Sequence, residues 1–321
     1  MEKNQSSTRD IVVVHGSRVQ VGDTTSWKGL VATFISYQDV KESSRALYTR
    51  TLSQFFLWIE STNRVFLQLT RQDILAYKDY LLGESLSSLT VGSYLTVVRK
   101  FYESAEAEKQ YPNIAKGVKV PKRVQAFKKQ HLTDSKSSEL LKHFKETSTR
   151  DFAIVNLILR TGLRCIEVVR ADIEDITFKG GKRILKIWGK GHDEKDDFVV
   201  LSDKAYQPIK DYLDTRKGAK AKEPLFTSFS HRNTGQRLTT RTISGICKMG
   251  LEAIGLDGRE FTAHSLRHTT AVAILNHGGQ LTDVQNVLRH SSPVTSQIYV
   301  ESIKEELRIR KAPELVLDYA F

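Results

Sequence analysis

The stretch from Tyr111 to Gln130 most constrains the fold, because it divides the chain into two parts. It contains Pro112 and Pro121, and proline disfavours helix at its own position and at the residue before it. The stretch also carries several basic side chains and no acidic one, and such a run by itself indicates a solvated tether. Because 321 residues are enough for two domains, we predict an interdomain linker over residues 111–130.

Four amphipathic stretches precede the linker. In each of them, apolar residues recur at the i, i+3, i+4 and i+7 spacing of one helix face. Thr70 and Asp73 have the spacing of a capping box, and Ser87 or Ser88 is expected to cap the fourth helix. We therefore predict a compact helical domain over residues 23–110.

Residues 1–22 are predicted to form an N-terminal extension. The segment Ile11–Val21 is rich in β-branched residues, which favours a short strand. No hairpin partner is evident nearby, and a flexible arm is the alternative. The sequence leaves the role of this extension open.

The period of the apolar pattern changes after Asp172. Three short runs rich in β-branched and aromatic residues predict an antiparallel sheet, with a turn at Gly180–Gly181 and a second at Gly189–Gly191. Helical stretches flank these runs, at about residues 135–145, 151–159, 203–216, 239–254, around His264, at 282–288 with Thr282 as the cap, and at 302–317. The predicted fold class is mainly α with a small antiparallel β-sheet (α+β), and the second domain is expected over residues 131–321.

The composition favours a polyanionic partner. The formal net charge of +12 and the pI of about 9.5 make nucleic acid the expected ligand, with a basic soluble protein that lacks such a partner as the alternative. Cys165 and Cys247 lie in apolar helical contexts and have no metal-ligand spacing. No apolar run reaches membrane-spanning length. We expect a cytoplasmic protein with neither a metal nor a cofactor, and no contact with a membrane.

Charged side chains interrupt the apolar helix that follows Thr262. His264 and Arg267 are three residues apart and are expected to project together, with His268 one step round the helix. A buried arginine needs an anionic partner, because an unpaired buried charge is costly. An ordinary salt-bridged start of a helix is the alternative for this segment.

Three other segments carry polar residues of the same kind. Arg164 follows a turn at Gly162, and Glu167 lies one helical step beyond it. Lys190 stands between two glycines, and His290 is followed nine residues later by Tyr299. For Lys190 alone, the simpler interpretation is a solvent-exposed hairpin lysine.

Taken together, these segments resemble the tyrosine recombinases, the family of the Xer recombinases and of phage and transposon integrases. The match lies in the order and spacing of six residues, namely Arg164, Lys190, His264, Arg267, His290 and Tyr299. The resemblance covers residues 24–310 and implies a two-domain, C-shaped DNA clamp. In it, residues 23–110 form the helical (SAM-like) core-binding domain, and the basic linker crosses the phosphate backbone. A helical bundle without DNA contact is the alternative for the first domain.

The resemblance also implies a role for most of these residues. Arg164 and Arg267 would hold the scissile phosphate, because a guanidinium is always charged and binds phosphate oxygens through a planar fork. Tyr299 would attack the phosphate and form a 3′-phosphotyrosyl link. Lys190 would protonate the 5′-hydroxyl leaving group, since lysine can give up a proton as arginine cannot.

The remaining roles are those of histidines and a carboxylate. His264 is the candidate base or proton relay, and His290 is the candidate donor of a hydrogen bond to the phosphate. Glu167 is expected to support Arg164 through a hydrogen bond, and His268 to be structural. The chain departs from the family at Arg289, where a glycine is usual and where the arginine suggests an extra phosphate contact. It departs again at Cys165, where a small aliphatic residue is more common.

The resulting functional prediction is site-specific DNA recombination without ATP or metal. The partners implied are double-stranded DNA with inverted-repeat core sites and further copies of the chain in a tetramer on paired sites, and accessory proteins are allowed. The segment from Ser302 is expected to dock on the adjacent subunit. A type IB topoisomerase and a non-cleaving DNA-binding regulator are the alternatives. The sequence does not indicate the target site or distinguish integration from excision, inversion or resolution.

Overall fold

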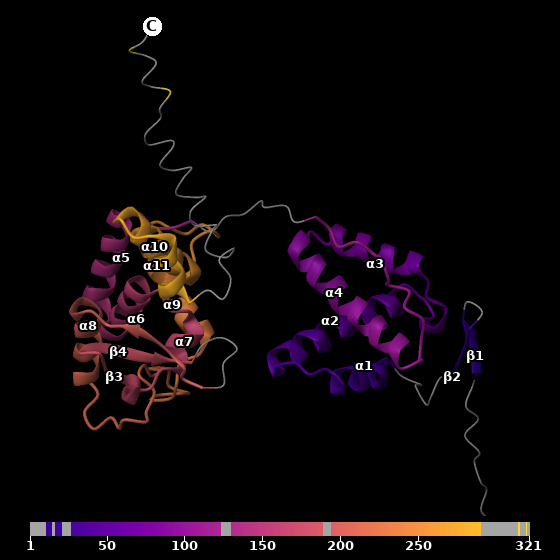
Figure 1. The fold of residues 1–321 in the computed structure, drawn as a ribbon, viewed down its shortest axis with the longest axis horizontal. Helices are drawn as coiled ribbons and strands as arrows, with labels where there is room; N and C mark the ends of the chain where they lie inside the picture. Colours follow the sequence, from indigo (N-terminus) through magenta and orange to yellow (C-terminus); the bar gives the residue numbers. More distant parts are fainter. Residues whose placement is uncertain are drawn as a thin grey trace, which may run out of the picture. The chain divides into compact units, whose positions relative to one another are not determined.

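The computed structural model describes residues 11–14, 17–20, 27–122, 130–188 and 194–289, together with Glu314 and Tyr319. The chain separates into two compact units, Met1–Ala126 and Phe127–Phe321. Figure 1 draws both units with colours that follow the sequence. Each unit has a hydrophobic core of its own.

The first unit is built mainly from helices that start at the predicted caps. The backbone N–H of Thr70 donates to Oδ2 of Asp73 at 2.8 Å, and Oγ of Ser87 accepts from the N–H of Thr90 at 3.1 Å. Both bonds satisfy polar groups at a helix N-terminus. The helices are α1 (Trp27–Ser36), α2 (Glu42–Ser61), the short 3-10 helix η1 (Phe66–Gln68), α3 (Arg71–Gly83) and α4 (Ser88–Ala107).

The core of the first unit extends beyond residue 110. Tyr111, Ile114 and Val118 are buried in it, and the hydroxyl of Tyr111 donates to the carbonyl oxygen of Leu69 at 3.2 Å. The first residues of the predicted linker therefore pack as part of this unit.

The N-terminal extension contains a β-hairpin. Strand β1 (Ile11–Val14) pairs antiparallel with β2 (Ser17–Gln20), with Val12 opposite Val19. The expectation that this segment has no hairpin partner nearby was wrong, because it pairs with itself. The signal overlooked in the sequence was the glycine between two runs of β-branched residues, a pattern typical of a hairpin.

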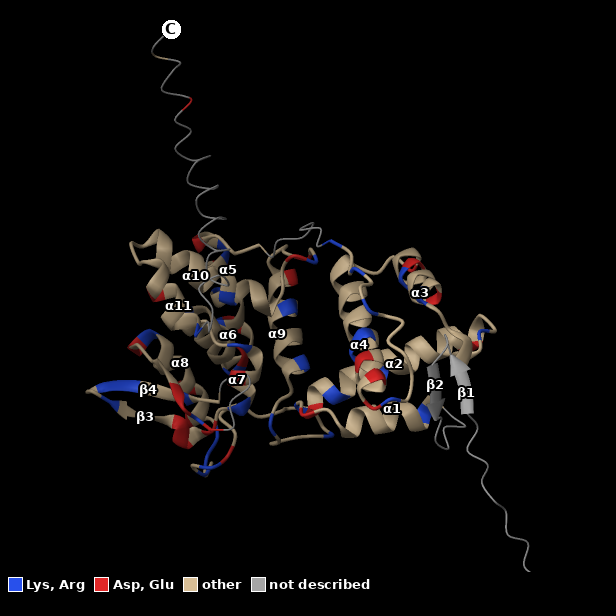
Figure 2. Cartoon of the chain, turned by 45° about the vertical axis from the view of Figure 1, so that its right-hand side comes forward, with Lys and Arg blue, Asp and Glu red and all other residues tan. Residues whose placement is uncertain are grey.

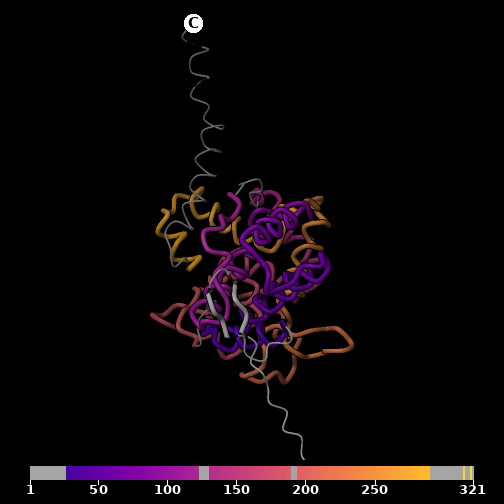
Figure 3. The backbone as a smooth tube through the Cα atoms, turned by 90° about the vertical axis from the view of Figure 1, so that its right-hand side faces the viewer, coloured from indigo at the N-terminus to yellow at the C-terminus, as the bar shows by residue number. Residues whose placement is uncertain are grey.

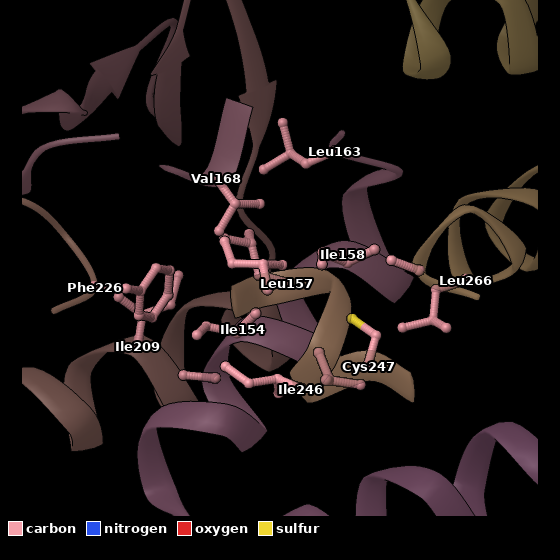
Figure 4. Packing of buried hydrophobic residues seen from close by; sticks show 14 of the residues in the cluster. Ile154, Leu157, Ile158, Leu163, Val168, Ile209, Phe226, Ile246, Cys247 and Leu266 are labelled. Carbon is pink, nitrogen blue, oxygen red and sulfur yellow. The ribbon is translucent and has the colours of Figure 1, made fainter. Parts of the chain in front are cut away.

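The second unit packs helices around α6, which is apolar on most sides. Ile154, Leu157 and Ile158 of α6 are fully buried, and Figure 4 shows them among side chains from the neighbouring helices. The unit comprises α5 (Asp134–Thr147), α6 (Thr149–Thr161), α7 (Cys165–Arg170), the 3-10 helix η2 (Ile173–Asp175), β3 (Ile176–Lys179), β4 (Lys182–Ile187), β5 (Asp197–Val200), α8 (Asp203–Asp214), α9 (Thr240–Ala253), α10 (Ala263–Asn276) and α11 (Leu281–Leu288).

The predicted three-stranded sheet is present. The strand order is β3-β4-β5, and both pairings are antiparallel. Leu185 lies between Ile176 and Val199 in the register and is buried against the helices. The prediction of a mainly α fold with a small antiparallel sheet is therefore confirmed.

One predicted cap was misplaced. Helix α11 begins at Leu281 with Gln280 as its N-cap, and not at Thr282. The reason is the carboxylate of Asp283, whose Oδ2 accepts from the backbone N–H of Gln280 at 2.7 Å. Helix α11 packs on α10 through a small apolar cluster, and the chain through this pair is yellow in Figure 3.

Within the described residues, none of the helices combines the length and the apolar character needed to cross a lipid bilayer.

Candidate active site

The structure describes three of the six predicted site residues. Arg164 stands immediately before α7, and His264 and Arg267 belong to α10. Lys190, His290 and Tyr299 lie outside the described residues, as does most of the predicted helix 302–317.

Gly162 forms the turn that leads to Arg164. It ends α6 in the left-handed conformation with φ of 62°, a region that glycine enters without strain. A β-carbon at this position would lie 2.4 Å from Cδ2 of Leu288. The turn therefore requires glycine both for its backbone angle and for the close approach of α11.

Glu167 holds Arg164 through two hydrogen bonds. Its Oε2 accepts from the backbone N–H of Arg164 at 2.7 Å, and its Oε1 accepts from Nη1 of Arg164 at 2.7 Å. The Glu167 side chain is fully buried, whereas that of Arg164 is 30% exposed. The predicted supporting role of Glu167 is confirmed, and it leaves the guanidinium of Arg164 accessible from one side.

Arg267 is buried and binds two carbonyl oxygens. Its residue is 2% exposed, Nη1 donates to the carbonyl of Gly162, and Nη2 donates to the carbonyl of Leu288. The sequence predicted an anionic partner, but these hydrogen bonds go to the C-terminal ends of α6 and α11. The last carbonyls of a helix lack intrahelical partners and carry the negative end of its dipole, so both bonds place the guanidinium at a favourable partial negative charge.

Helix α10 is fixed by two threonines that follow Arg267 by two and three positions. Oγ1 of Thr270 donates to the carbonyl of Leu159 in α6 at 2.9 Å. Oγ1 of Thr269 accepts from the backbone N–H of Leu132 at 2.9 Å. Arg267 thus lies on a helix that is bonded directly to the element preceding Arg164.

The two histidines of α10 differ in exposure. His264 is exposed in the first turn, whereas Arg267 is buried; the expectation that they project together stays a prediction. Positions i and i+3 differ by about 60° around the helix axis, which is enough for one to face solvent and the other the core. His268 is 7% exposed, and its ring lies 5.7 Å from that of His131, as expected of a structural residue.

Arg289 is bonded to the same carboxylate as Arg164. Its Nη2 donates to Oε2 of Glu167 at 2.7 Å, and its side chain is 9% exposed. The sequence suggested that this arginine makes an extra phosphate contact, but in the structure its guanidinium is bound to Glu167. No sequence spacing indicates this pairing, because 122 positions separate the two residues.

The second departure from the family lies beside Arg164. Sγ of Cys165 is 3.7 Å from Oγ of Ser244 on α9, and burial raises the pKa of the thiol above its usual value. A raised pKa keeps the group protonated and poorly nucleophilic at neutral pH. Cys165 therefore acts as a packing residue here.

An ionic network missed by the sequence analysis lies close in sequence to Lys190. Nζ of Lys195 donates to Asp172 at 2.9 Å and to Asp175 at 2.7 Å, and Nη2 of Arg237 donates to Asp172 at 2.5 Å. Burial alone would raise the pKa of Asp172, but the hydrogen bonds from Lys195 and Arg237 outweigh it and lower that pKa. The network ties the residues just before β5 to the loop between α7 and β3.

Basic side chains are spread over the surface of this unit. Figure 2 shows Lys and Arg in blue on β4 and along α9, and these include Lys182, Lys186 and Arg241. Exposed positive charge of this kind suits a polyanionic ligand.

Comparison with known proteins points to one family. A model of the phage integrase family matches residues 130–306, a range that includes all six predicted site residues. The tyrosine recombinase XerC of Pelobacter propionicus is 30% identical over 260 residues, which are 79% of this chain and 83% of that protein. The tyrosine recombinase XerD of Proteus mirabilis is 26% identical over 281 residues, which are 85% of this chain and 87% of that protein.

A solved structure shares the fold over most of the chain. The XerH site-specific recombinase, bound to a palindromic difH substrate in a post-cleavage complex, has a TM-score of 0.69 and 21% sequence identity. The match covers 89% of this chain and 84% of that one. At this identity the likeness is one of fold.

Proposed function

Because the chain belongs to the phage integrase family and is a site-specific tyrosine recombinase, we propose that six of its residues carry out the reaction. The enzyme cuts and rejoins DNA strands with a tyrosine as the nucleophile, and that nucleophile is Tyr299. The other five are Arg164, Lys190, His264, Arg267 and His290.

The observation that carries this assignment is the bonding of Arg267. Its guanidinium binds the carbonyl of Gly162, two positions before Arg164, and that of Leu288, two positions before His290. One buried side chain therefore joins the segments that precede two of the other proposed site residues. An arrangement of this kind holds positive charge in place before a phosphate binds. Charge that is preorganised in this way stabilises the transition state more than charge that must reorient during the reaction.

The first chemical step exchanges one phosphate ester for another. The oxygen of Tyr299 forms a bond to phosphorus, and the bond from phosphorus to the 5′ oxygen breaks. A free phenol has a pKa of about 10, so His264 takes or relays its proton. Lys190 gives a proton to the departing 5′ oxygen, and the product is a 3′-phosphotyrosyl link with a 5′-hydroxyl.

The side chains around the phosphate stabilise its added negative charge. Arg164 and Arg267 hold the non-bridging oxygens, and His290 donates a hydrogen bond to one of them. In the reverse step, a 5′-hydroxyl from a partner strand attacks the link and releases Tyr299. The phosphotyrosyl bond conserves the energy of the phosphodiester, so rejoining needs no nucleotide.

The substrate is double-stranded DNA with inverted-repeat core sites, on which four copies of the chain assemble. Support comes from the net charge of +12 and from the palindromic substrate bound by the structurally similar XerH. The protein works in the cytoplasm, which suits its two free cysteines. The two units would close around the duplex as a clamp, with accessory proteins as further partners.

Capture of covalently bound DNA tests this function. The protein is incubated with fragmented genomic DNA and denatured, and the DNA that stays attached is sequenced. We expect one enriched sequence with inverted repeats, a protein-linked 3′ end and a free 5′-hydroxyl. Adducts spread over unrelated sequences would indicate a topoisomerase, and the absence of adducts would indicate a non-cleaving regulator.

The proposed assembly has a separate test on paired half-sites. Removal of residues 304–321 should leave binding to one half-site within about twofold, but abolish cooperative binding and the pairing of two sites, because the terminal segment docks on a neighbouring copy. If the shortened protein pairs sites normally, or is insoluble as a monomer, this segment packs within its own chain instead.

A further inference from the structure

We propose that Arg289 is a positioning residue for strand cleavage, an inference that rests on the function proposed above. Arg289 follows the last residue of α11 with φ of 54° and ψ of 52°, in the left-handed region. This conformation costs a residue with a β-carbon roughly 1–2 kcal/mol and costs glycine almost nothing. Backbone stability alone would therefore favour glycine over arginine at position 289.

The side chain of Arg289 is held by several groups. Nη2 donates to Oε2 of Glu167 at 2.7 Å, and Nη1 donates to the carbonyl of Val287 at 2.6 Å. Nε lies 3.9 Å from Oδ2 of Asp197. With a side chain only 9% exposed, the guanidinium is oriented by the protein rather than presented to solvent.

The contact with Glu167 acts on Arg164. The same Oε2 that binds Arg289 also accepts the backbone N–H of Arg164, and the other oxygen binds the Arg164 guanidinium. A buried carboxylate that faces Arg164 alone would cancel much of its charge. With Arg289 present, two cations share the buried carboxylate of Glu167, so less of the Arg164 charge is cancelled and more of it remains for an incoming phosphate. Asp197 offsets Arg289 only weakly, because it lies 3.9 Å away and its side chain is 41% exposed.

The same contact fixes the end of α11 relative to α7. Arg267 binds the carbonyl of Leu288, and Arg289 binds Glu167 of α7. Two consecutive residues are thus attached, one to Arg267 itself and the other to Glu167, which binds Arg164. Loss of one attachment would loosen the geometry that cleavage depends on, and small misplacements can cost about 100-fold in rate.

The test uses Arg289→Gly, which relieves the strained backbone while removing the guanidinium. Single-turnover cleavage of a nicked suicide substrate is measured at saturating protein, together with DNA affinity as a function of salt. We expect the cleavage rate constant to fall by about 10- to 100-fold. The melting temperature is measured alongside, because relief of the strained backbone raises it and loss of the buried ion pair lowers it. Arg289→Lys should recover part of the rate, because it restores the charge but not the two-pronged contact.

A matched control comes from the first unit. Lys109 is exposed and also has a left-handed backbone, with φ of 55°. Lys109→Gly removes one positive charge and similar backbone strain from the first unit, and the variant should cleave at the wild-type rate. Loss of rate in this variant would mean that net charge alone explains the effect.

The decisive comparison adds Glu167→Gln. If Arg289 acts by balancing Glu167, then Arg289→Gly should change the rate less than about threefold once Glu167 is neutral, because interacting residues are not additive. If Arg289 binds the phosphate directly, the loss should persist in both backgrounds, and the log–log salt slope of binding should fall by about 0.9. That outcome, or wild-type cleavage by Arg289→Gly, overturns the proposal. Failure of the wild-type protein to cleave would instead overturn the proposed function.

Discussion

The guanidinium of Arg267 donates a hydrogen bond to the carbonyl oxygen of Gly162, 105 positions earlier in the chain. Gly162 ends α6 and leads two residues later to Arg164. The position of one proposed phosphate-binding arginine is therefore tied to the turn that presents the other.

Substitution of Gly162 by alanine should reduce both stability and cleavage. Alanine would be strained at φ of 62° and would place a β-carbon 2.4 Å from Leu288. We expect the free energy of unfolding to fall by about 2–4 kcal/mol, from backbone strain and overpacking together, as measured by urea denaturation. The matched control is Gly180→Ala, which has φ of 56° but no atom within 4 Å of the added carbon. Equal losses in the two variants would show that the contact with Leu288 is unimportant.

The ionic network around Asp172 should make the protein sensitive to acid. The pKa of Asp172 is lowered from 3.8 in the folded state. Its contribution to stability is therefore complete above the unfolded-state pKa and is lost as pH falls through the lower, folded-state pKa. Asp172→Asn should lower the free energy of unfolding by about 2 kcal/mol at pH 7, as measured by urea denaturation. Below pH 4 the free energy of unfolding of the variant should fall less steeply with decreasing pH than that of the wild type.

An exposed ion pair serves as the control for that prediction. Lys210 and Asp214 lie 2.7 Å apart, with side chains 50% and 62% exposed, and exposed pairs contribute little to stability. Asp214→Asn should therefore leave the urea unfolding curve nearly unchanged, both at pH 7 and below pH 4. If Asp172→Asn behaves in the same way, the network does not stabilise the fold.

Replacement of Lys190 by alanine should block cleavage of ordinary DNA. General acid catalysis typically contributes about 10²- to 10⁴-fold, and we expect a loss in that range in single-turnover assays. A substrate with sulfur in place of the 5′ bridging oxygen should be cleaved at close to the wild-type rate, since a thiolate leaves without a proton. If the variant cleaves the sulfur substrate no faster than the oxygen one, another residue is the acid.

Local features of this fold could be predicted from the sequence. Gly162, the Gly180–Gly181 turn and the caps at Thr70 and Ser87 each depend on a few neighbouring residues, and the structure confirms all of them. The support of Arg164 by Glu167 was predictable for the same reason, because the two residues are one helical turn apart.

Contacts between distant segments could not be predicted in this way. The pairing of Arg289 with Glu167 and that of Lys195 with Asp172 join residues that no periodicity relates. The two hydrogen bonds described for Arg267 go to backbone carbonyls, which every residue has, so the side-chain sequence carries no sign of them. The pairing of residues 11–14 with residues 17–20 was missed because the run from Ile11 to Val21 was interpreted as one strand.

The central claim is that Tyr299 is the nucleophile. The most direct measurement is the covalent adduct formed on a nicked suicide substrate, resolved on a denaturing gel and mapped by peptide mass spectrometry. Tyr299→Phe keeps the aromatic ring and loses only the attacking oxygen, so we expect DNA binding within about twofold of wild type and no adduct. An adduct formed by Tyr299→Phe, or a wild-type adduct mapped to any other residue, would contradict the account.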